Sequence, residues 1–256
     1  EKQQIKGPSG NLIRIEIFVH GALCMAVSGK CYLSLHTTNS SANRGACIQN
    51  CRKTYTVTDK EDGHQFDIDN EYIMSPKDLC TIGFINKVID SGSSVLKIEG
   101  RGRSPEYVKT TTQCYREAAD AYLKKTYNKE KVKEWMNRLK TVYNRGFWDG
   151  YYLGQKIGEW TGIHGSKATK KKIYLGKAKK YFTKIQVAEF DLEAQELQKG
   201  DSILITGRTT GVIEAVADEI RINDSQVKEV KKGDNFSMKI NCKVQPNDKL
   251  YKVLNS

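Results

Sequence analysis

The segment that decides the fold begins Glu16-Ile-Phe-Val-His20-Gly21-Ala-Leu-Cys24 and runs through Cys31 to Cys47-Ile-Gln-Asn-Cys51. Residues 12–19 form an apolar, β-branched run that ends at His20 and Gly21. Such a run is typical of a buried strand that emerges at the carboxyl end of a parallel sheet. Loops at that edge carry the chemistry of α/β barrels. The cysteines that follow the strand are therefore predicted to lie where a site would form.

Five of the seven cysteines are candidate metal ligands: Cys24, Cys31, Cys47, Cys51 and, in Ser75-Pro-Lys-Asp-Leu-Cys80, Cys80. Thiolates ligate iron–sulfur clusters in sets of four, and they also hold structural zinc. The spacing matches neither a zinc ribbon nor a ferredoxin, and buried unpaired thiols are common in protein cores. Because Cys47 and Cys51 stand among Arg, Gly, Asn and Gln, a metal or cluster is the favoured interpretation. Cys114 and Cys242 are interpreted as structural thiols.

Length and charge set the broad class. The 256 residues suffice for one large domain, or for one medium and one small domain. The net charge of +12 favours a polyanionic partner, nucleic acid first, or else a generally basic surface. No apolar run approaches the roughly 20 residues that span a bilayer, and no leader precedes the first strand, so we expect a cytoplasmic protein with no membrane partner. We also expect an upstream region before Glu1.

Strand and helix signals alternate after the cysteines. Residues 55–72 suggest a polar hairpin with Asp62-Gly63 at its turn. Ser75-Pro76 predicts the start of a helix that carries Cys80 one turn inside it and ends near Ser91. Three further elements are predicted: a strand at residues 95–100 and helices at residues 104–123 and 130–143. This order is typical of a parallel barrel or sheet.

The last third of the chain has a different pattern. Residues 162–172 have the composition of a linker, and short alternating strands follow. They are predicted at residues 185–190, 202–206, 211–213, 219–222, 235–240 and 250–253. Such a series suggests a small β-barrel. The predicted fold class is therefore α/β: the C-terminal part of a TIM-like barrel with its first half absent (residues 1–165), followed by a small all-β barrel (residues 172–256).

Charged residues supply further site candidates. His20 ends the first strand in a position suited to catalysis or to a structural hydrogen bond. Lys97 and Glu99 alternate on one face of the second strand, where they form either part of a site or a buried ion pair. Arg101 and Arg103 follow in a loop and could hold an anionic substrate. Around residues 167–184, eight lysines are interleaved with aromatic residues, a pattern of nucleic-acid surfaces or of a solvated face.

Several motifs together resemble one family. Glu16-x-Phe18-x-x-Gly21-Ala-Leu-Cys24-x4-Gly29-x-Cys31 is similar to the signature of the collagenase-like peptidases, family thirty-two of the peptidases of unassigned mechanism. Further blocks occur in the family's order: Arg44-Gly-Ala-Cys47, Ser75-Pro-Lys-Asp-Leu-Cys80, Lys97-Ile-Glu-Gly-Arg101, Ser104-Pro-Glu-Tyr107 and Asn144-Arg-Gly-Phe147. The resemblance implies a TIM-like barrel followed by a barrel of translation-factor type.

The family resemblance also implies a function. Its name implies proteolysis, whereas several relatives are iron–sulfur proteins that hydroxylate RNA or a quinone precursor. In the tRNA branch a wobble uridine is hydroxylated and prephenate is required. The five cysteines match positions that supply the ligands of a [4Fe-4S] cluster, which leaves Cys51 and Cys80 as alternatives for the fourth site.

We therefore predict an iron–sulfur-dependent enzyme that hydroxylates tRNA or other RNA, with prephenate as co-substrate and a protein as electron donor. A collagenase-like peptidase is the alternative, and a scaffold stabilised by its metal is the third interpretation. The predicted catalytic residues are His20, Lys97, Glu99 and Arg101. The predicted substrate- or RNA-binding residues are Arg44, Arg103, Lys170, Lys171 and Lys172.

Overall fold

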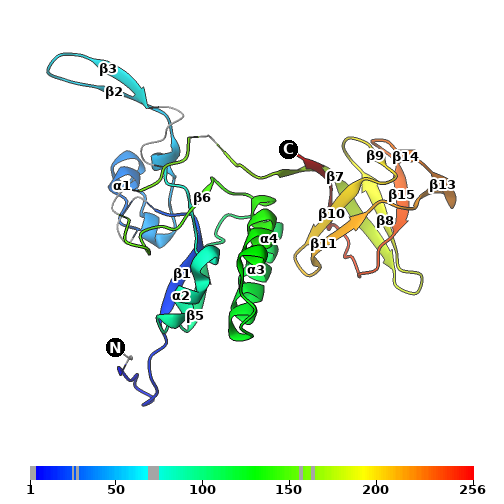
Figure 1. The fold of residues 1–256 in the computed structure, drawn as a ribbon. Coiled ribbons are helices and arrows are strands. Elements are labelled where there is room, and N and C mark those ends of the chain that lie inside the picture. The colour runs from blue at the N-terminus through cyan, green and yellow to red at the C-terminus, as the bar shows by residue number, and fades with distance from the viewer. Residues whose placement is uncertain (1–3, 25, 27–28, 69–74, 156–157, 163–164) are drawn as a thin grey trace. The chain divides into compact units, whose positions relative to one another are not determined.

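The computed structural model describes residues 4–24, 26, 29–68, 75–155, 158–162 and 165–256. The chain divides into two compact units (Figure 1). Unit 1 comprises residues 1–103 and 110–167, and unit 2 comprises residues 104–109 and 168–256. No helix among the described residues is long and apolar enough to cross a membrane.

Up to residue 167 the elements are β1 (Glu16–Gly21), α1 (Tyr32–Thr38), η2 (Ala42–Arg44), η3 (Asn50–Arg52), β2 (Tyr55–Thr58), β3 (Gln65–Ile68), β4 (Asp78–Cys80), η4 (Ile82–Phe84), α2 (Ile85–Asp90), β5 (Val95–Ile98), α3 (Pro105–Leu123), α4 (Lys129–Lys140) and β6 (Phe147–Trp148). The η elements are single 3-10 turns. The predicted helices after residues 104 and 130 are confirmed, as is the hairpin of β2 and β3, whose turn holds Gly63 at φ +77°.

Unit 1 contains a four-stranded sheet in the order β5-β1-β4-β6. β1 is parallel to β5 and β4 is parallel to β6, but β1 and β4 are antiparallel. The predicted α/β class is confirmed, whereas the expectation of a purely parallel sheet is wrong. The four paired strands form an open sheet with β5 and β6 at its edges, so a closed barrel is not seen in the described part of unit 1.

The helix predicted from Ser75-Pro76 is wrong at its start. Asp78, Leu79 and Cys80 form the strand β4, and a helix begins only at Ile85 after one 3-10 turn. All three residues of β4 are buried, and the strand is paired on both sides, with β1 and with β6. An amphipathic helix at this position would expose one face to solvent, whereas here all three residues are buried and both sides of the segment pair with other strands.

The core of unit 1 lies between this sheet and the helices α3 and α4. Val19 of β1 packs with Tyr115 and Ala118 of α3 and with Trp135 and Leu139 of α4, all of them buried. The amphipathic pattern of the two helices thus predicts which sides face the sheet.

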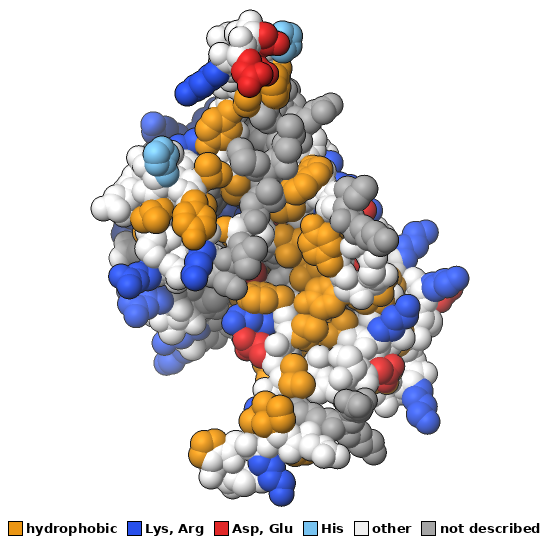
Figure 2. Space-filling model, turned by 90° about the vertical axis from the view of Figure 1, so that its left-hand side faces the viewer, with side chains coloured by type: hydrophobic (Ala, Val, Ile, Leu, Met, Phe, Trp, Pro, Cys, Tyr) orange, Lys and Arg blue, Asp and Glu red, His pale blue; other side chains and the backbone are white. Residues whose placement is uncertain are grey.

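Other apolar side chains of unit 1 remain exposed, and Figure 2 shows hydrophobic side chains gathered in a band on one face. The exposed large hydrophobic residues of unit 1 include Leu12, Ile13, Ile15, Phe18, Tyr152 and Leu153.

The strands of unit 2 are β7 (Lys170–Phe182), β8 (Val187–Leu192), β9 (Leu197–Gln198), β10 (Ser202–Gly207), β11 (Gly211–Val216), β12 (Ile220–Ile222), β13 (Ser225–Val227), β14 (Glu229–Val230), β15 (Asn235–Lys239) and β16 (Lys249–Asn255). Eight of them form one sheet in the order β11-β10-β16-β7-β8-β15-β12-β13, in which every pairing is antiparallel. The predicted strands are confirmed. The predicted closed barrel is not, because β11 and β13 are the two edges of the sheet among residues 168–256.

The longest strand, β7, is absent from the prediction: residues 170–172 are assigned to a linker, and the predicted strands begin only at residue 185. Its lysines give it a polar composition, but Leu175 and Ala178 point into the core while Lys179 and Lys180 are exposed. The core of unit 2 is apolar and continuous, and includes the stacked rings of Phe190 and Phe236, whose centroids are 5.5 Å apart. Pairing with β16 and β8 on its two sides therefore makes β7 a central strand.

Candidate functional site

The site begins where β1 ends. Gly21 has φ +120°, and a Cβ there would lie 2.7 Å from both the Cβ and the carbonyl oxygen of Glu99. Only glycine allows the two backbones to approach this closely. The Glu99 amide donates to the His20 carbonyl at 2.8 Å, just past a register shift between β1 and β5. Residues 22–24 follow this contact at the carboxyl end of β1, which is also where the parallel strand β5 ends.

The segments that carry Cys31 and Cys51 are joined by one buried amide. The Asn50 Nδ2 donates to the Leu33 carbonyl at 3.2 Å and to Thr37 Oγ1 at 2.6 Å, which joins η3 to α1. Cys31 is the N-cap of α1, and its sulfur accepts from the Ser34 amide at 3.4 Å. Hydrogen bonds from Ser34 lower the pKa of the Cys31 thiol.

Two arginines connect the remaining cysteine segments. Arg52, directly after Cys51, donates to the Leu23 carbonyl at 3.5 Å and to Ser75 Oγ at 2.9 Å. Arg101 donates to the Gly45 carbonyl at 2.6 Å, and a Cβ on Gly45 would lie 2.6 Å from the same guanidinium nitrogen. The loop that leads to Cys47 is therefore held against the loop that follows β5.

These contacts bring together Cys24, Cys31, Cys47 and Cys51, which we call the four-thiol group. Burial is the main cause that raises the pKa of Cys51. The charge of Arg52 lowers this pKa, and charge on the other three thiols raises it further. Cys51 is therefore within electrostatic range of each of the other three thiols. All are free thiols, and Cys24 and Cys47 are exposed.

The four-thiol group fits an iron–sulfur cluster in the type and number of its donors. Among the described residues, no three His, Cys, Asp or Glu side chains are close enough to hold a single metal ion. A cubane binds one thiolate at each of its four irons, so its ligand sulfurs stand farther apart than those around one ion. Four thiols are the donor set that a [4Fe-4S] cluster requires.

Cys80 lies in a different environment from the four-thiol group. It is buried in β4, with its sulfur 3.7 Å from the Met136 sulfur and 3.8 Å from the Tyr115 hydroxyl. Burial raises its pKa to about 11, and burial does the same for Cys114. A thiol of this kind stays protonated at neutral pH, as an ordinary core residue does.

His20 is buried beside the same tyrosine. Its Nδ1 lies 3.3 Å from the Tyr115 hydroxyl, which donates to the Val19 carbonyl at 2.8 Å and accepts from the Thr81 amide at 3.0 Å. Burial, aided by the charge of Arg103, lowers the pKa of His20 to about 3. The imidazole is therefore neutral at physiological pH, and its surroundings are those of the hydrogen-bonded structural residue that the sequence also allowed.

Lys97 of β5 lies at the surface, and Glu99, just after the strand, is partly exposed. Lys97 Nζ is 2.7 Å from Glu16 Oε1 and 4.9 Å from the centre of the Phe18 ring, and both ends of the ion pair are exposed. Glu99 accepts from the Arg101 amide at 2.7 Å, which stabilises the turn after β5. Lys97 and Glu99 thus make separate contacts. Arg44, in η2, is exposed.

The lysines of β7 are largely paired within unit 2. Lys177 contacts Glu193 at 2.7 Å, and Lys179 lies 3.5 Å from Glu189. Lys172 lies over the Tyr251 ring at 4.7 Å. Lys170 and Lys171, at the start of the strand, are exposed. The lysine-rich stretch is thus partly a solvated, ion-paired face of the sheet, with its first residues accessible to a polyanion.

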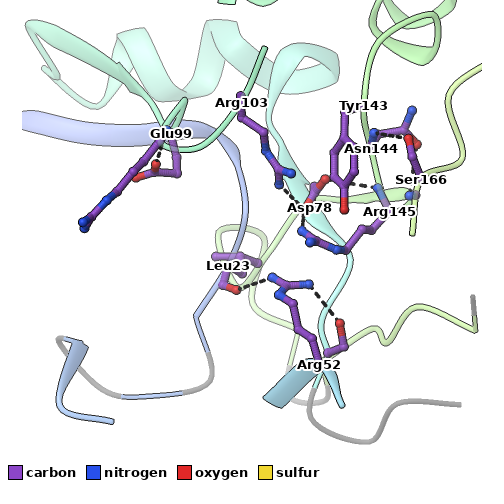
Figure 3. A network of polar contacts seen from close by, with 12 residues as sticks. Leu23, Arg52, Asp78, Glu99, Arg103, Tyr143, Asn144, Arg145 and Ser166 are labelled. Atoms are coloured by element: carbon purple, nitrogen blue, oxygen red, sulfur yellow. Dashed lines mark hydrogen bonds and ion pairs between the residues drawn. The ribbon is translucent and has the colours of Figure 1, made fainter. Parts of the chain in front are cut away.

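Sequence reasoning singled out Arg103 as an anion-binding candidate but missed Asp78 and Arg145, which lie beside it, as Figure 3 shows. Asp78 is buried, and Arg103 and Arg145 lie 3.9 Å and 3.6 Å from its Oδ1. Burial raises the pKa of Asp78, although Arg145, Arg103 and Arg52 oppose that shift. The sequence signal that could have pointed to Arg145 is its place in the family-like block Asn144-Arg-Gly-Phe147. Its role depends on Asp78, 67 residues away in the sequence, and no pattern in the sequence links the two.

The chain matches a model of known proteins over most of unit 1. The model, described as Peptidase family U32, covers residues 2–162. A protein named collagenase from Porphyromonas gingivalis strain W83 is 59% identical over 98% of this chain and 61% of its own length. An uncharacterized protease from Methanocaldococcus jannaschii is 36% identical over 93% of this chain and 59% of its own length. The chain thus spans about three fifths of each of these relatives.

More distant relatives carry a different name. A tRNA hydroxylation protein from Bacillus subtilis is 36% identical over 81% of this chain and 51% of its own length. Among solved structures, the C-terminal domain of a Geobacillus thermoleovorans protein described as a U32 peptidase matches 31% of this chain and 90% of that domain. Its TM-score is 0.30 and its identity 15%. The family match, with these sequence identities, shows that the chain belongs to peptidase family U32.

Proposed function

We propose that the protein to which this chain belongs is a collagenase-like hydrolase that cleaves peptide bonds. The observation that carries this proposal is the 59% identity to a protein named collagenase, across 98% of the chain. Relatives named for tRNA hydroxylation are 29–37% identical over 55–81% of the chain. The comparisons therefore favour the alternative prediction over the RNA-modifying enzyme that the sequence alone placed first.

The four-thiol group supplies the nucleophiles for such a reaction within the described residues. A peptidase needs a nucleophile or an activated water. No group of His, Cys, Asp and Glu in the described ranges is spaced to hold one catalytic metal ion. Cys31 combines partial exposure with a lowered pKa, the two properties that favour a reactive thiolate.

The test is hydrolysis of denatured collagen by the purified chain. We expect release of soluble peptides, a loss of at least tenfold in Cys31→Ser, and no change in Cys242→Ser, which removes an exposed thiol of unit 2. Hydrolysis that persists in Cys31→Ser would exclude the thiol as nucleophile. If the chain releases no more peptide than a heat-denatured sample of the same chain, peptide hydrolysis by this chain is excluded.

A second candidate is iron–sulfur-dependent hydroxylation of RNA, and a specific observation favours it. Asn50 and Arg52, the two neighbours of Cys51, bind Leu33 and Leu23, which lie beside the segments of Cys31 and Cys24. Four thiols brought together in this way fit a [4Fe-4S] cluster, with Cys51 rather than the buried Cys80 as fourth ligand. The cluster would supply electron transfer. Prephenate as co-substrate, a protein electron donor, tRNA as substrate and a cytoplasmic location belong to this candidate.

Anaerobic purification tests the second candidate without an activity assay. It predicts a brown protein with about four irons and four sulfides per chain. Cys51→Ser should lose the colour, whereas Cys80→Ser and Cys114→Ser should keep it. Mass spectrometry of tRNA from a deletion strain tests the reaction itself. Unchanged hydroxyuridine would exclude it, and a colourless protein with one tightly bound zinc would exclude the cluster.

A further inference from the structure

The hairpin of β2 and β3 has one apolar face that is exposed. Cross-strand pairing joins Val57 to Phe66 and Thr56 to Asp67. Because side chains alternate along a strand, Tyr55, Val57 and Phe66 share one face. Thr56 and Asp67 lie on the other face, where the Thr56 hydroxyl donates to Asp67 Oδ1 at 2.7 Å. Val57 is 36% and Phe66 is 49% exposed. Such an alternating pattern usually buries its apolar face, so this hairpin has an apolar face available to a partner.

The outer edges of the hairpin are also available. Among the described residues, β2 and β3 pair only with one another, so the outer side of each strand has backbone N–H and C=O groups without a partner strand. Figure 1 shows the hairpin extending away from the rest of unit 1. An isolated two-stranded hairpin is only marginally stable in water, and further strands stabilise it. The hairpin can therefore accept an extended chain as a third strand.

The charge of the hairpin is opposite to that of the whole chain. Residues 55–68 contain four acidic residues and one lysine, whereas the net charge of the chain is +12. The acidic residues are exposed, and none forms an ion pair with a described residue: Asp59, Glu61, Asp62 and Asp67. Because like charges repel, this surface disfavours the phosphates of nucleic acid and also the same hairpin of a second copy. A matching partner therefore has apolar and positively charged side chains.

The hairpin begins beside the four-thiol group. Tyr55 is the first residue of β2, and its hydroxyl donates to the Asn50 carbonyl at 2.8 Å. Asn50 directly precedes Cys51, and its side-chain amide binds the carbonyl of Leu33, close to Cys31 in the sequence. A chain that lies along the hairpin therefore passes, at the start of β2, close to the segments that carry two of the thiols.

We propose that the β2–β3 hairpin binds, beside the four-thiol group, an extended segment of polypeptide in which apolar and basic residues alternate. The added strand places its apolar side chains on the face of Val57 and Phe66, and its basic side chains on the face of Asp67. Main-chain hydrogen bonds to the outer edge supply affinity, and the alternating side chains supply selectivity. This inference rests on the proposed hydrolysis of peptide bonds, because it assigns the substrate class of the same site.

Fluorescence anisotropy of the full chain tests the proposal with a labelled peptide of about ten residues in which lysine and valine alternate. We expect saturable binding, and at least tenfold weaker binding of a matched peptide with serine in place of lysine. Phe66→Ser should weaken binding of the lysine peptide at least fivefold. Phe182→Ser is the matched control, because that ring is also exposed but belongs to unit 2. It should bind as the unmodified chain does.

Asp67→Asn separates recognition of charge from an effect on folding. The asparagine keeps an acceptor for the Thr56 hydroxyl but removes the negative charge. The lysine peptide should bind several-fold more weakly to this variant, and the serine peptide should bind as it does to the unmodified chain. Equal binding of the lysine peptide by Asp67→Asn and the unmodified chain would overturn the basic part of the assignment.

Hydrogen exchange locates the bound peptide. The lysine peptide should slow the amide exchange of residues 55–67, because amides on the outer edge become paired. Three results would overturn the proposal: no saturable binding, protection only outside these residues, or equal affinity in Phe66→Ser. A labelled oligouridylate that protects residues 55–67 would also overturn it, because the partner would then be a nucleic acid.

Binding and hydrolysis are measured separately, so the two proposals can fail separately. Peptide binding at the hairpin without release of peptides from denatured collagen would overturn the proposed hydrolysis and support the binding site. Hydrolysis that is unchanged in Phe66→Ser, together with no binding of the lysine peptide, would overturn the role of the hairpin alone.

Discussion

The two units treat their buried polar groups differently. In unit 2 the buried Asp248 accepts a hydrogen bond from the Gln245 amide at 2.8 Å and another from Thr210. In unit 1 the buried Asp78 Oδ1, Arg145 Nη1 and Trp148 Nε1 have no hydrogen-bond partner among the described residues. In the described part of the chain, one unsatisfied side-chain atom, Glu106 Oε2, belongs to unit 2, and the other seven belong to unit 1. Unsatisfied buried groups cost stability and are retained mainly where function requires them. Within the described ranges, the unsatisfied buried atoms are thus concentrated in unit 1.

The distribution of tryptophan makes this comparison measurable. Trp135, Trp148 and Trp160 are the three tryptophans of the chain, and all belong to unit 1. Tryptophan fluorescence therefore reports the unfolding of unit 1. Hydrogen exchange of peptides from residues 170–255 reports unit 2. Each variant below is expected to change one of these signals.

The largest expected effect is in the core of unit 2. Phe236→Ala removes a buried ring stacked on Phe190 and should lower the free energy of unfolding of unit 2 by about 3–5 kcal/mol. Exchange of residues 170–255 should become faster, while the urea midpoint of tryptophan fluorescence stays the same. Phe182→Ala, at an exposed ring, is the control. A parallel shift of the fluorescence midpoint would show that the units unfold together.

The next effect is the acid sensitivity of unit 1. His20 has a pKa of about 3 when folded and about 6.5 when unfolded. Below pH 6.5 the unfolded chain takes up a proton that the folded chain does not, so stability falls as the pH falls towards 3. The loss is about 1.4 kcal/mol per pH unit, or about 3 kcal/mol at pH 4.5. His20→Gln should reduce the slope of stability against pH, measured by urea unfolding with fluorescence detection. His64→Gln, exposed in the β2–β3 turn, should keep the original slope.

A smaller effect is expected at the end of β1. Gly21→Ala adds strain at φ +120° and places a Cβ 2.7 Å from Glu99, so unit 1 should lose about 1–3 kcal/mol. Gly10→Ala also has a positive φ, +78°, but its Cβ would meet no atom within 4 Å. The difference between the two variants measures the collision together with the greater backbone strain at φ +120°. Equal losses would mean that β1 and β5 can separate at Gly21 without cost.

Periodic patterns predicted much of the fold. The helices α3 and α4 and most strands of unit 2 follow from local sequence, because an amphipathic face or a period of two identifies each one. β4 and β7 could not be found in that way. β4 has three buried residues including Asp78, and β7 is rich in lysine. Both are strands because neighbours on either side pair with them, and those neighbours are distant in the sequence.

The sequence by itself determined which residues are candidates for chemistry at the end of β1. Gly21 and the cysteines at positions 24, 31, 47 and 51 identify that region, because several thiols among polar loop residues do not follow the pattern of a buried core. Only the tertiary structure decided how they are arranged. It buried Cys80 beside Tyr115, made His20 neutral, and placed Arg103 and Arg145 around Asp78. Burial and charge at a residue depend on segments far away in the chain, and local sequence contains no record of that proximity.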